Sequence, residues 1–371
     1  RRKIQMAAVF AMQGVGALLS VIVVLLCLWA GMSQGATWRF ALAFGSAPAV
    51  LAFPWRLRMH ETESFQRVKD ARRDGHTHHS ELRSAYRFYK WHMLGTASTW
   101  FLLDVVFYAN GLFNHDVTAV ILSDGTGSTA LKDAKNAAIL CCMGVPGYWL
   151  SVMFLERLGR KNIQLYGFLI IGTLYLICGL GREWFLGGAV LGHTQMRQYL
   201  FLVLYGLTFL FSNFGPNTTT FVIPGEIFPS EVRATCHGVS AASGKAGAAF
   251  GAYFFPLLLG PGGTAHPTKE GMLTCMVMCG VIAYLGALAT MLLTPSYNGD
   301  SLARDEGSGY LLLDYSCLHP SMEEMSLFGN TNKEMSYTMV QTVEGSHNYS
   351  MTSGKTGKMD TRNSLDLDTM E

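Results

Sequence analysis

Charged residues are scarce in this chain of 371 residues. Asp, Glu, Lys and Arg make up only 15% of it, whereas about 25% is usual in soluble globular proteins. Half of the residues are hydrophobic, and the 40 glycines and 22 phenylalanines are typical of helices that pack closely within lipid. The net charge of +2, with basic residues in loops rather than along a groove, excludes a nucleic-acid-binding protein. The composition argues against a soluble enzyme and indicates a protein embedded in the lipid bilayer.

The sequence also lacks the ligand spacings of a metal site. Its eight cysteines mostly lie inside apolar runs and form no CxxC unit with histidine, so we interpret them as small buried hydrophobic residues. Cys275 and Cys279, four residues apart, could share a helix face as a metal pair, but packing is the favoured interpretation. With no metal set and no nucleophile beside a base near a membrane face, the sequence predicts no enzyme, no metal and no cofactor.

Long apolar runs are what the sequence has in abundance. A helix needs about 20 apolar residues to cross the hydrocarbon core, and eight segments meet this length between charged or turn-forming residues. We therefore predict an all-α, polytopic membrane protein with eight transmembrane helices. The expected spans are residues 4–29, 38–55, 91–112, 137–155, 163–180, 199–220, 239–259 and 272–293.

The basic residues fall in loops that an even number of spans places on one side of the membrane. Arg1, Arg2 and Lys3 precede the first span, residues 56–90 form the most basic loop, and residues 156–161 add three more basic side chains. Short loops rich in Lys and Arg stay cytoplasmic. We therefore expect both ends of the chain in the cytoplasm, and the plasma membrane as its location.

The last part of the chain has no sustained apolar pattern. Residues 295–371 are rich in Ser, Thr, Asp, Asn and Met, a composition that predicts a disordered cytoplasmic tail. Its Ser and Thr residues are candidate phosphorylation sites, so regulatory kinases or trafficking factors are candidate partners.

Two charged residues of opposite sign lie deep within the expected spans, Asp104 in the third and Lys245 in the seventh. A charge at the bilayer centre costs about 2.5–3.5 kcal/mol on insertion scales, so it generally faces a partner or a cavity. One interpretation is an ion pair that holds two helices together, and the other is a substrate or proton site. Trp100, Asp104 and Tyr108 share one helix face at i, i+4 and i+8 and combine two donors with a titratable acceptor, which favours the site.

Two further polar features lie at membrane depth. Gln13 in the first span is either an interhelical hydrogen-bonding residue or a ligand contact. In the sixth span, Gly215 and Pro216 interrupt the helix, which is tolerated where the freed backbone lines a cavity or is satisfied by neighbours; a packing kink is the alternative. Asn217 would supply hydrogen-bond donors beside this break.

Two of the long strings in the sequence are GTASTWFLLD at residues 95–104 and AVFAMQG at residues 8–14. With several others, they resemble the phosphate:proton symporters of the major facilitator superfamily, the first string its seventh helix and the second its fifth. ERLGRK at residues 156–161 is similar to a charged element found across the superfamily, which would latch neighbouring helices or simply anchor the loop at the membrane surface. The remaining strings are GPNTTTF (215–221), PGEIFP (224–229), TCHG (235–238) and SGKAG (243–247).

The resemblance implies a major facilitator fold that lacks its first four helices, so that the chain is the later part of a longer protein. Residues 1–55 would then form the last two helices of the N-terminal bundle and residues 56–90 a cytoplasmic linker. Residues 91–294 would form the C-terminal six-helix bundle, followed by the disordered tail of residues 295–371.

The resemblance also implies an inorganic phosphate transporter that works by proton-coupled symport and alternating access, with phosphate and protons as its ligands. Trp, Tyr, Lys and amide donors can bind phosphate oxygens, and Asp104 can accept the O–H of a protonated phosphate. Sulfate has no such proton near neutral pH, so the carboxylate would select against it. Asp104 would also be the proton-coupling residue. The implied phosphate-binding residues are Gln13, Trp100, Asp104, Tyr108, Asn217 and Lys245.

Two other functions are compatible with the sequence. A phosphate-sensing receptor without transport would use the same pocket and signal through its tail. A related transporter would carry a sugar or another organic anion, although the face formed by Trp100, Asp104 and Tyr108 and the GPNTTTF string favour phosphate.

Overall fold

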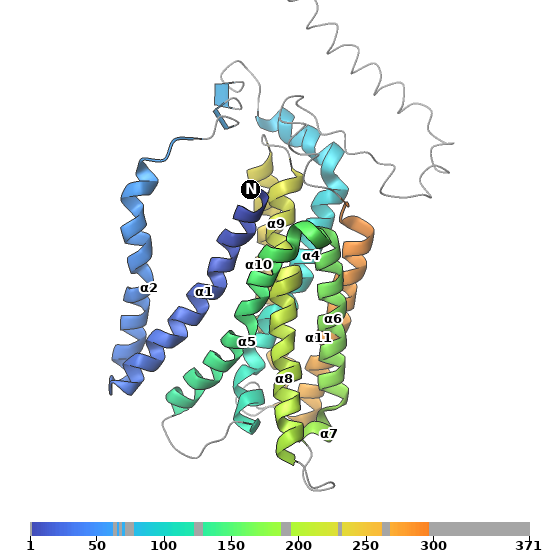
Figure 1. Cartoon of the computed structure of the whole chain (residues 1–371). Helices are drawn as coiled ribbons and strands as arrows, with labels where there is room; N and C mark the ends of the chain where they lie inside the picture. Colours follow the sequence, from blue (N-terminus) through green and yellow to red (C-terminus); the bar gives the residue numbers. More distant parts are fainter. Residues whose placement is uncertain are drawn as a thin grey trace, which may run out of the picture. The chain divides into compact units, whose positions relative to one another are not determined.

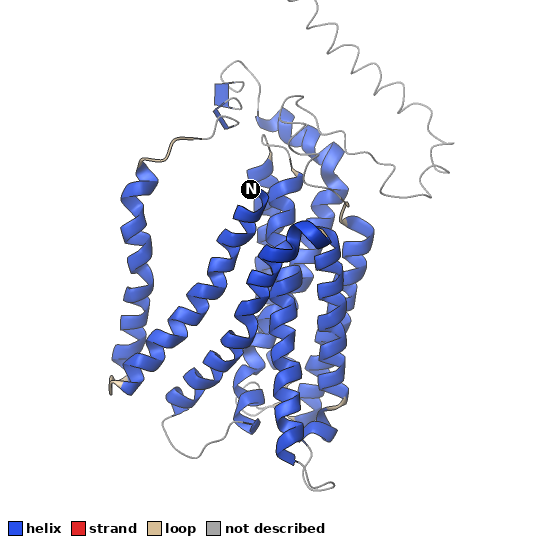
Figure 2. Cartoon of the chain, in the orientation of Figure 1, coloured by secondary structure: helices blue, strands red, loops and turns tan. Residues whose placement is uncertain are grey.

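The computed structural model is all-helical within the residues that it describes, which are 2–61, 65–66, 69–70, 78–121, 129–186, 194–228, 232–261 and 268–296. Figure 1 shows the order of the helices, and Figure 2 shows that helix accounts for nearly all of the described chain. The prediction of an all-α protein is confirmed. The elements are α1 (Arg2–Trp29), α2 (Gln34–Leu57), α4 (His78–Ile121), α5 (Thr129–Leu158), α6 (Arg160–Leu180), α7 (Arg182–Leu186), α8 (Thr194–Ser212), the π-helix η1 (Asn213–Asn217), α9 (Thr218–Ile227), α10 (Arg233–Leu258) and α11 (Lys269–Leu293).

Six helical segments in the described part of the chain are long and apolar enough to cross a membrane by length and composition. They correspond to expected spans in α1, α2, α5, α6, α8 to α9, and α11. The other two expected spans lie in α4 and α10, which contain Asp104 and Lys245. Charged and small polar residues lower the mean hydropathy of a helix. An apolar criterion alone therefore misses the two helices that hold the deep charges.

Helix α4 begins at His78, within the segment that the sequence predicts as a linker. Apolarity marks only the part of a helix that lies in hydrocarbon, whereas intrahelical hydrogen bonds continue wherever the backbone stays helical. Much of the rest of the linker, and nearly all of the predicted tail, lie outside the described residues.

Helices α4 and α10 pack along a seam of glycines. Gly247 and Gly251 of α10 face the backbone carbonyls of Phe101 and Val105, and a Cβ atom at either glycine would collide with them. Small residues at helix interfaces in lipid allow this close approach and the dispersion contacts that come with it. The seam fixes the position of α10 against α4, and with it the relative position of their charged side chains.

Two hydrogen bonds cross the same seam. The hydroxyls of Thr96 and Ser240 share a hydrogen bond of 2.8 Å, and the Ser243 hydroxyl donates to the carbonyl of Ala97 at 3.0 Å. Interhelical bonds of this kind contribute about 0.6 kcal/mol each in membrane proteins. They therefore help to fix the position of α10 along α4 but add little to stability.

The start of α6 binds two other helices. The buried Arg160 makes two hydrogen bonds to the carboxylate of Glu226 in α9, Nε to Oε2 at 3.0 Å and Nη2 to Oε1 at 3.2 Å. Lys161 donates to the carbonyl of Met291 near the end of α11 at 3.1 Å. These contacts favour the latching interpretation of the ERLGRK string over simple anchoring at the membrane surface.

Most of the cysteines pack as the sequence predicts. Cys178, Cys275 and Cys279 are fully buried in the main hydrophobic core, whereas Cys142 is exposed. Among the described residues, no group of three or more potential metal ligands comes together.

Candidate functional site

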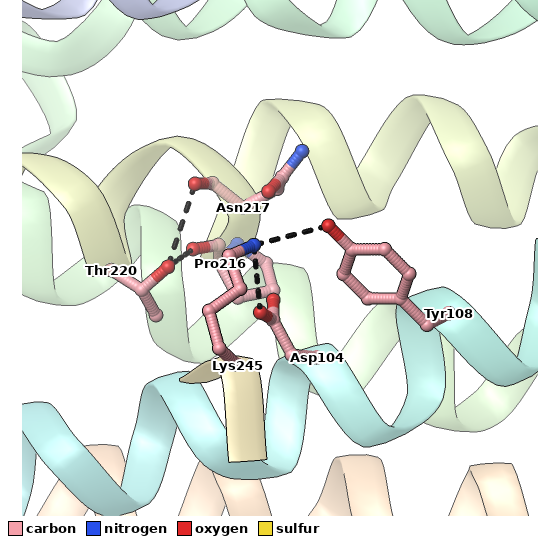
Figure 3. A network of polar contacts seen from close by, with 6 residues as sticks. All are labelled: Asp104, Tyr108, Pro216, Asn217, Thr220 and Lys245. Carbon is pink, nitrogen blue, oxygen red and sulfur yellow. Dashed lines mark hydrogen bonds and ion pairs between the residues drawn. The ribbon is translucent and has the colours of Figure 1, made fainter. Parts of the chain in front are cut away.

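The two deep charges of the sequence meet in the structure. Nζ of Lys245 lies 3.7 Å from Oδ2 of Asp104 and donates a hydrogen bond of 3.1 Å to the Tyr108 hydroxyl. The ammonium also lies 5.1 Å from the centre of the Tyr108 ring. Figure 3 shows it joined to both partners, between the carboxylate and the hydroxyl. Helix α10 thus presents a cation to two residues that are one turn apart on α4.

This ion pair is incomplete. The side chain of Asp104 is 4% exposed and that of Lys245 is 67% exposed. Oδ2 of Asp104 is buried and has no hydrogen-bond partner, because 3.7 Å is longer than a hydrogen bond. A buried acceptor without a donor costs about 1–3 kcal/mol, so this carboxylate is placed to accept a hydrogen bond from something else.

A second acid–base pair in the chain provides an internal comparison. Both oxygens of Glu226 accept hydrogen bonds from Arg160, and both side chains are buried. That is the geometry of a saturated structural salt bridge. Asp104 and Lys245 have longer spacing, an unused oxygen and an exposed cation, which favours a binding site over a structural clasp.

Trp100 lies one turn before Asp104 on the same face of α4. Its indole packs edge-on against the rings of His237 at 5.6 Å and Phe221 at 6.4 Å, and Gly244 of α10 leaves room for it. Trp100 is 8% exposed. Trp100, Asp104 and Tyr108 thus share one face of α4 as predicted, with Trp100 held between α9 and α10.

The Gly and Pro of the sixth span do interrupt the helix. Residues Asn213–Asn217 form a π-helical turn in which Gly215 has φ −130° and ψ −121°. The Asn213 carbonyl within the break accepts hydrogen bonds from the Thr218 hydroxyl at 2.7 Å and from the Ser151 hydroxyl at 3.0 Å. This buried carbonyl is therefore satisfied at the break, since neighbouring hydroxyls supply its donors.

This break places Asn217 beside the ion pair, as Figure 3 shows. Asn217 is 6% exposed. Its Nδ2 atom donates to Oδ1 of Asn213 at 2.8 Å and to the Tyr148 hydroxyl at 3.0 Å. Both amide hydrogens are thus used within the protein. Asn217 thus supplies donors beside the break, as the sequence predicts, but in this conformation Asn213 and Tyr148 use them, and Asn217 can offer a ligand only its oxygen.

Gln13 lies on the neighbouring helix α1 with its side chain exposed, and it makes no hydrogen bond with another described residue. The next residue, Gly14, packs against the ring of Tyr148, and Phe10 stacks on Phe221 at 4.8 Å. The structure therefore brings five of the six predicted site residues together and sets Gln13 on the helix beside them.

Sequence analysis missed Tyr148 and His237. Tyr148 is 5% exposed and binds Asn217, while the ring of His237 packs edge-on against the rings of both Trp100 and Phe221. A tyrosine in the middle of an apolar span is the signal that could have identified Tyr148, since a buried hydroxyl requires a partner. His237 lies in the TCHG string, but its contacts come from two other helices.

Ionisable residues beside a broken helix at membrane depth are typical of membrane transporters, and this is the class that the fold and the site define. Comparison with known proteins gives the family. Residues 120–296 match the family model described as "Sugar (and other) transporter". The chain is 34% identical over 359 residues to "Probable inorganic phosphate transporter 1-3" of Arabidopsis thaliana, covering 81% of this chain and 67% of that protein.

Two other relatives give the same result. "Low affinity inorganic phosphate transporter 1" of Petunia hybrida is 34% identical over 356 residues, which cover 80% of this chain and 64% of the relative. "Probable inorganic phosphate transporter 1-6" of Arabidopsis thaliana is 36% identical over 354 residues, with 81% and 65% covered. The chain belongs to the inorganic phosphate transporter family of the major facilitator superfamily, and it spans about two thirds of the length of these relatives.

Proposed function

We propose that the protein containing this chain transports inorganic phosphate together with protons by alternating access. The observation that supports it most directly is the incomplete ion pair of Asp104 and Lys245 beside the break at Asn217. The names of the relatives point to the same substrate. A structural ion pair would leave no reason for a carboxylate oxygen without a hydrogen bond beside an exposed ammonium.

The side chains match the chemistry of a partly protonated phosphate. Lys245 supplies positive charge, and the Tyr108 hydroxyl, which accepts a hydrogen bond from Lys245, keeps its own hydrogen for a phosphate oxygen. Asp104 pairs with a P–OH group. Sulfate, which has no proton, would set an oxygen against this carboxylate and be rejected.

Proton coupling follows from the hydrogen bond between Asp104 and phosphate. Two negatively charged oxygens repel unless a proton lies between them, and that proton can come from the carboxyl group or from the phosphate. Anion binding and proton binding are therefore linked. An unloaded, deprotonated Asp104 pairs instead with Lys245, which gives the empty site a stable charge balance.

The two groups of helices, residues 1–55 and 91–294, would move against each other around this site, as repeat-built transporters do. We place both ends of the chain in the cytoplasm, on the distribution of basic residues, and propose the plasma membrane as its location. Residues 295–371 would be the segment available to kinases or trafficking factors.

Uptake of labelled phosphate by the complete protein in liposomes, with an imposed pH gradient, tests the proposal. Asp104→Asn keeps the shape of the side chain but removes its titratable group, so we expect it to abolish gradient-driven accumulation while phosphate binding survives. Glu270→Gln, which alters an exposed carboxylate at the start of α11, is the control and should accumulate phosphate normally. Normal accumulation by Asp104→Asn would show that coupling lies elsewhere.

A further inference from the structure

Asn213, Asn217 and Tyr148 form a chain of side-chain hydrogen bonds beside the ion pair. One backbone carbonyl decides which group donates and which accepts at each link. Nδ2 of Asn213 donates to the carbonyl oxygen of Gly144 at 3.0 Å. A carbonyl oxygen can only accept, so the amide nitrogen, not the amide oxygen, must face Gly144. Oδ1 of Asn213 consequently faces Asn217 as an acceptor.

The next two links follow from the first. Asn217 must turn its nitrogen toward Oδ1 of Asn213, because the opposite orientation would bring two acceptors together. The same nitrogen donates to the Tyr148 hydroxyl oxygen, so both hydrogens of the Asn217 amide are used. Tyr148 accepts in this contact, which leaves its own hydroxyl hydrogen free to donate.

The Tyr148 hydroxyl hydrogen and the Asn217 amide oxygen, which this chain leaves unused, lie close to the ion pair. The Tyr148 hydroxyl lies 3.0 Å from Nδ2 of Asn217, and η1, which contains Asn217, packs against α4, which carries Asp104 and Tyr108. Figure 3 shows the nitrogen of the Asn217 amide turned away from the Lys245 ammonium. No group among the described residues donates to Oδ1 of Asn217, so this oxygen is available as an acceptor.

We infer that Tyr148 is a further binding residue of the substrate site, whose hydroxyl donates to an unprotonated oxygen of the bound anion, while Asn217 accepts a hydrogen from a protonated one and so discriminates between anions. The inference rests on the proposed phosphate transport. When Asp104 is deprotonated, as in its pair with Lys245, the anion needs two protons of its own, one for its hydrogen bond with Asp104 and one for its hydrogen bond with Asn217. Dihydrogen phosphate supplies both protons and sulfate supplies neither. The hydrogen-bond chain from Gly144, which orients the Asn217 amide, therefore adds a second selection against sulfate to that made by Asp104.

Comparison of phosphate with methylphosphonate separates the donor role of Tyr148 from the acceptor role of Asn217. Methylphosphonate has a methyl group in place of one P–OH. Calorimetric titration of the complete, purified transporter, at a mildly acidic pH where both ligands are monoanions, measures both affinities. We expect the wild-type protein to bind phosphate about tenfold more tightly than methylphosphonate. Tyr148→Phe should weaken both ligands by the same factor of about ten, since it removes a donor to an oxygen that both possess. Asn217→Leu should remove the preference for phosphate.

Tyr205→Phe is the matched control. The buried Tyr205 hydroxyl donates to the Asn110 carbonyl at 3.0 Å, outside the site, and its loss should leave both affinities unchanged. The inference would be overturned by a folded Tyr148→Phe protein with wild-type phosphate affinity, or by a loss confined to phosphate, which would place Tyr148 on the P–OH instead. If Tyr148→Phe does not fold, a retained preference for phosphate in Asn217→Leu would overturn the inference by itself. Failure of the wild-type protein to bind phosphate would instead refute the proposed function.

Discussion

Gly247 of α10 touches the backbone carbonyl of Phe101 in α4, so the two helices that hold the ion pair approach as closely as their backbones allow. The contact lies about half a turn from Lys245 on one helix and a little under one turn from Asp104 on the other. Any side chain at this position has to push the helices apart, and with them the ammonium and the carboxylate.

The first prediction is therefore that Gly247→Ala lowers stability, because the added Cβ atom has no space. Overpacking of this kind costs about 1–3 kcal/mol. Gly238→Ala on the same helix, where a Cβ atom meets nothing within 4 Å, is the matched control and should be neutral or slightly stabilising, since Ala favours helix over Gly. Thermal melting of both variants in detergent measures the difference, and equal melting temperatures would contradict the prediction.

The second prediction concerns Lys245 as a contributor of positive charge. Lys245→Met keeps length and apolar bulk but removes the charge, so phosphate affinity should fall by about 1–3 kcal/mol. Lys245→Arg should rescue it only in part, because a planar guanidinium cannot replace a compact ammonium. Lys90→Met, at an exposed position of α4, should bind phosphate normally.

If Asp104 and Lys245 formed only a structural ion pair, their variants would change stability rather than phosphate affinity. Lys245→Met would then lower stability, and the double variant Asp104→Asn, Lys245→Met would recover it. Unchanged phosphate affinity in a stable Lys245→Met protein, measured by calorimetry, would leave the ammonium without a part in recognition.

The third prediction concerns the saturated pair of Arg160 and Glu226. Glu226→Ala removes two charge-assisted hydrogen bonds from a buried guanidinium and should destabilise the protein by about 3–5 kcal/mol. Replacing both residues by methionine removes both charges and should cost less than Glu226→Ala alone. A thermal double-variant cycle measures the coupling, and additive effects would show that the salt bridge contributes nothing of its own.

The fourth prediction concerns topology. In a background with the exposed Cys142 changed to Ser, a membrane-impermeant maleimide applied to intact cells should label Gln34→Cys but neither Arg58→Cys nor Ser336→Cys. Gln34 and Arg58 lie at opposite ends of α2, so they report the two faces of the membrane. Labelling of Arg58→Cys and Ser336→Cys from opposite sides would rule out an even number of spans between them.

Much of the fold follows from local sequence. Apolar runs long enough to cross the bilayer can satisfy their backbone only as helices, and charge can persist at that depth only beside a partner or a cavity. The i, i+4, i+8 spacing alone was enough to place Trp100, Asp104 and Tyr108 on one face. The Gly215–Pro216 break was also predicted from local sequence, because Pro has no N–H to continue the helix.

Tertiary structure decided which atoms these residues offer to a ligand. Tyr148 and Asn217 are 69 residues apart in the chain, and no local pattern indicates that their side chains meet. The orientation of the Asn217 amide depends on the carbonyl of Gly144, on another helix, through Asn213. Sequence spacing determines the face of a helix on which a residue lies, whereas the direction of a hydrogen bond depends on the neighbouring helix, whose register is set by packing contacts far away in the sequence.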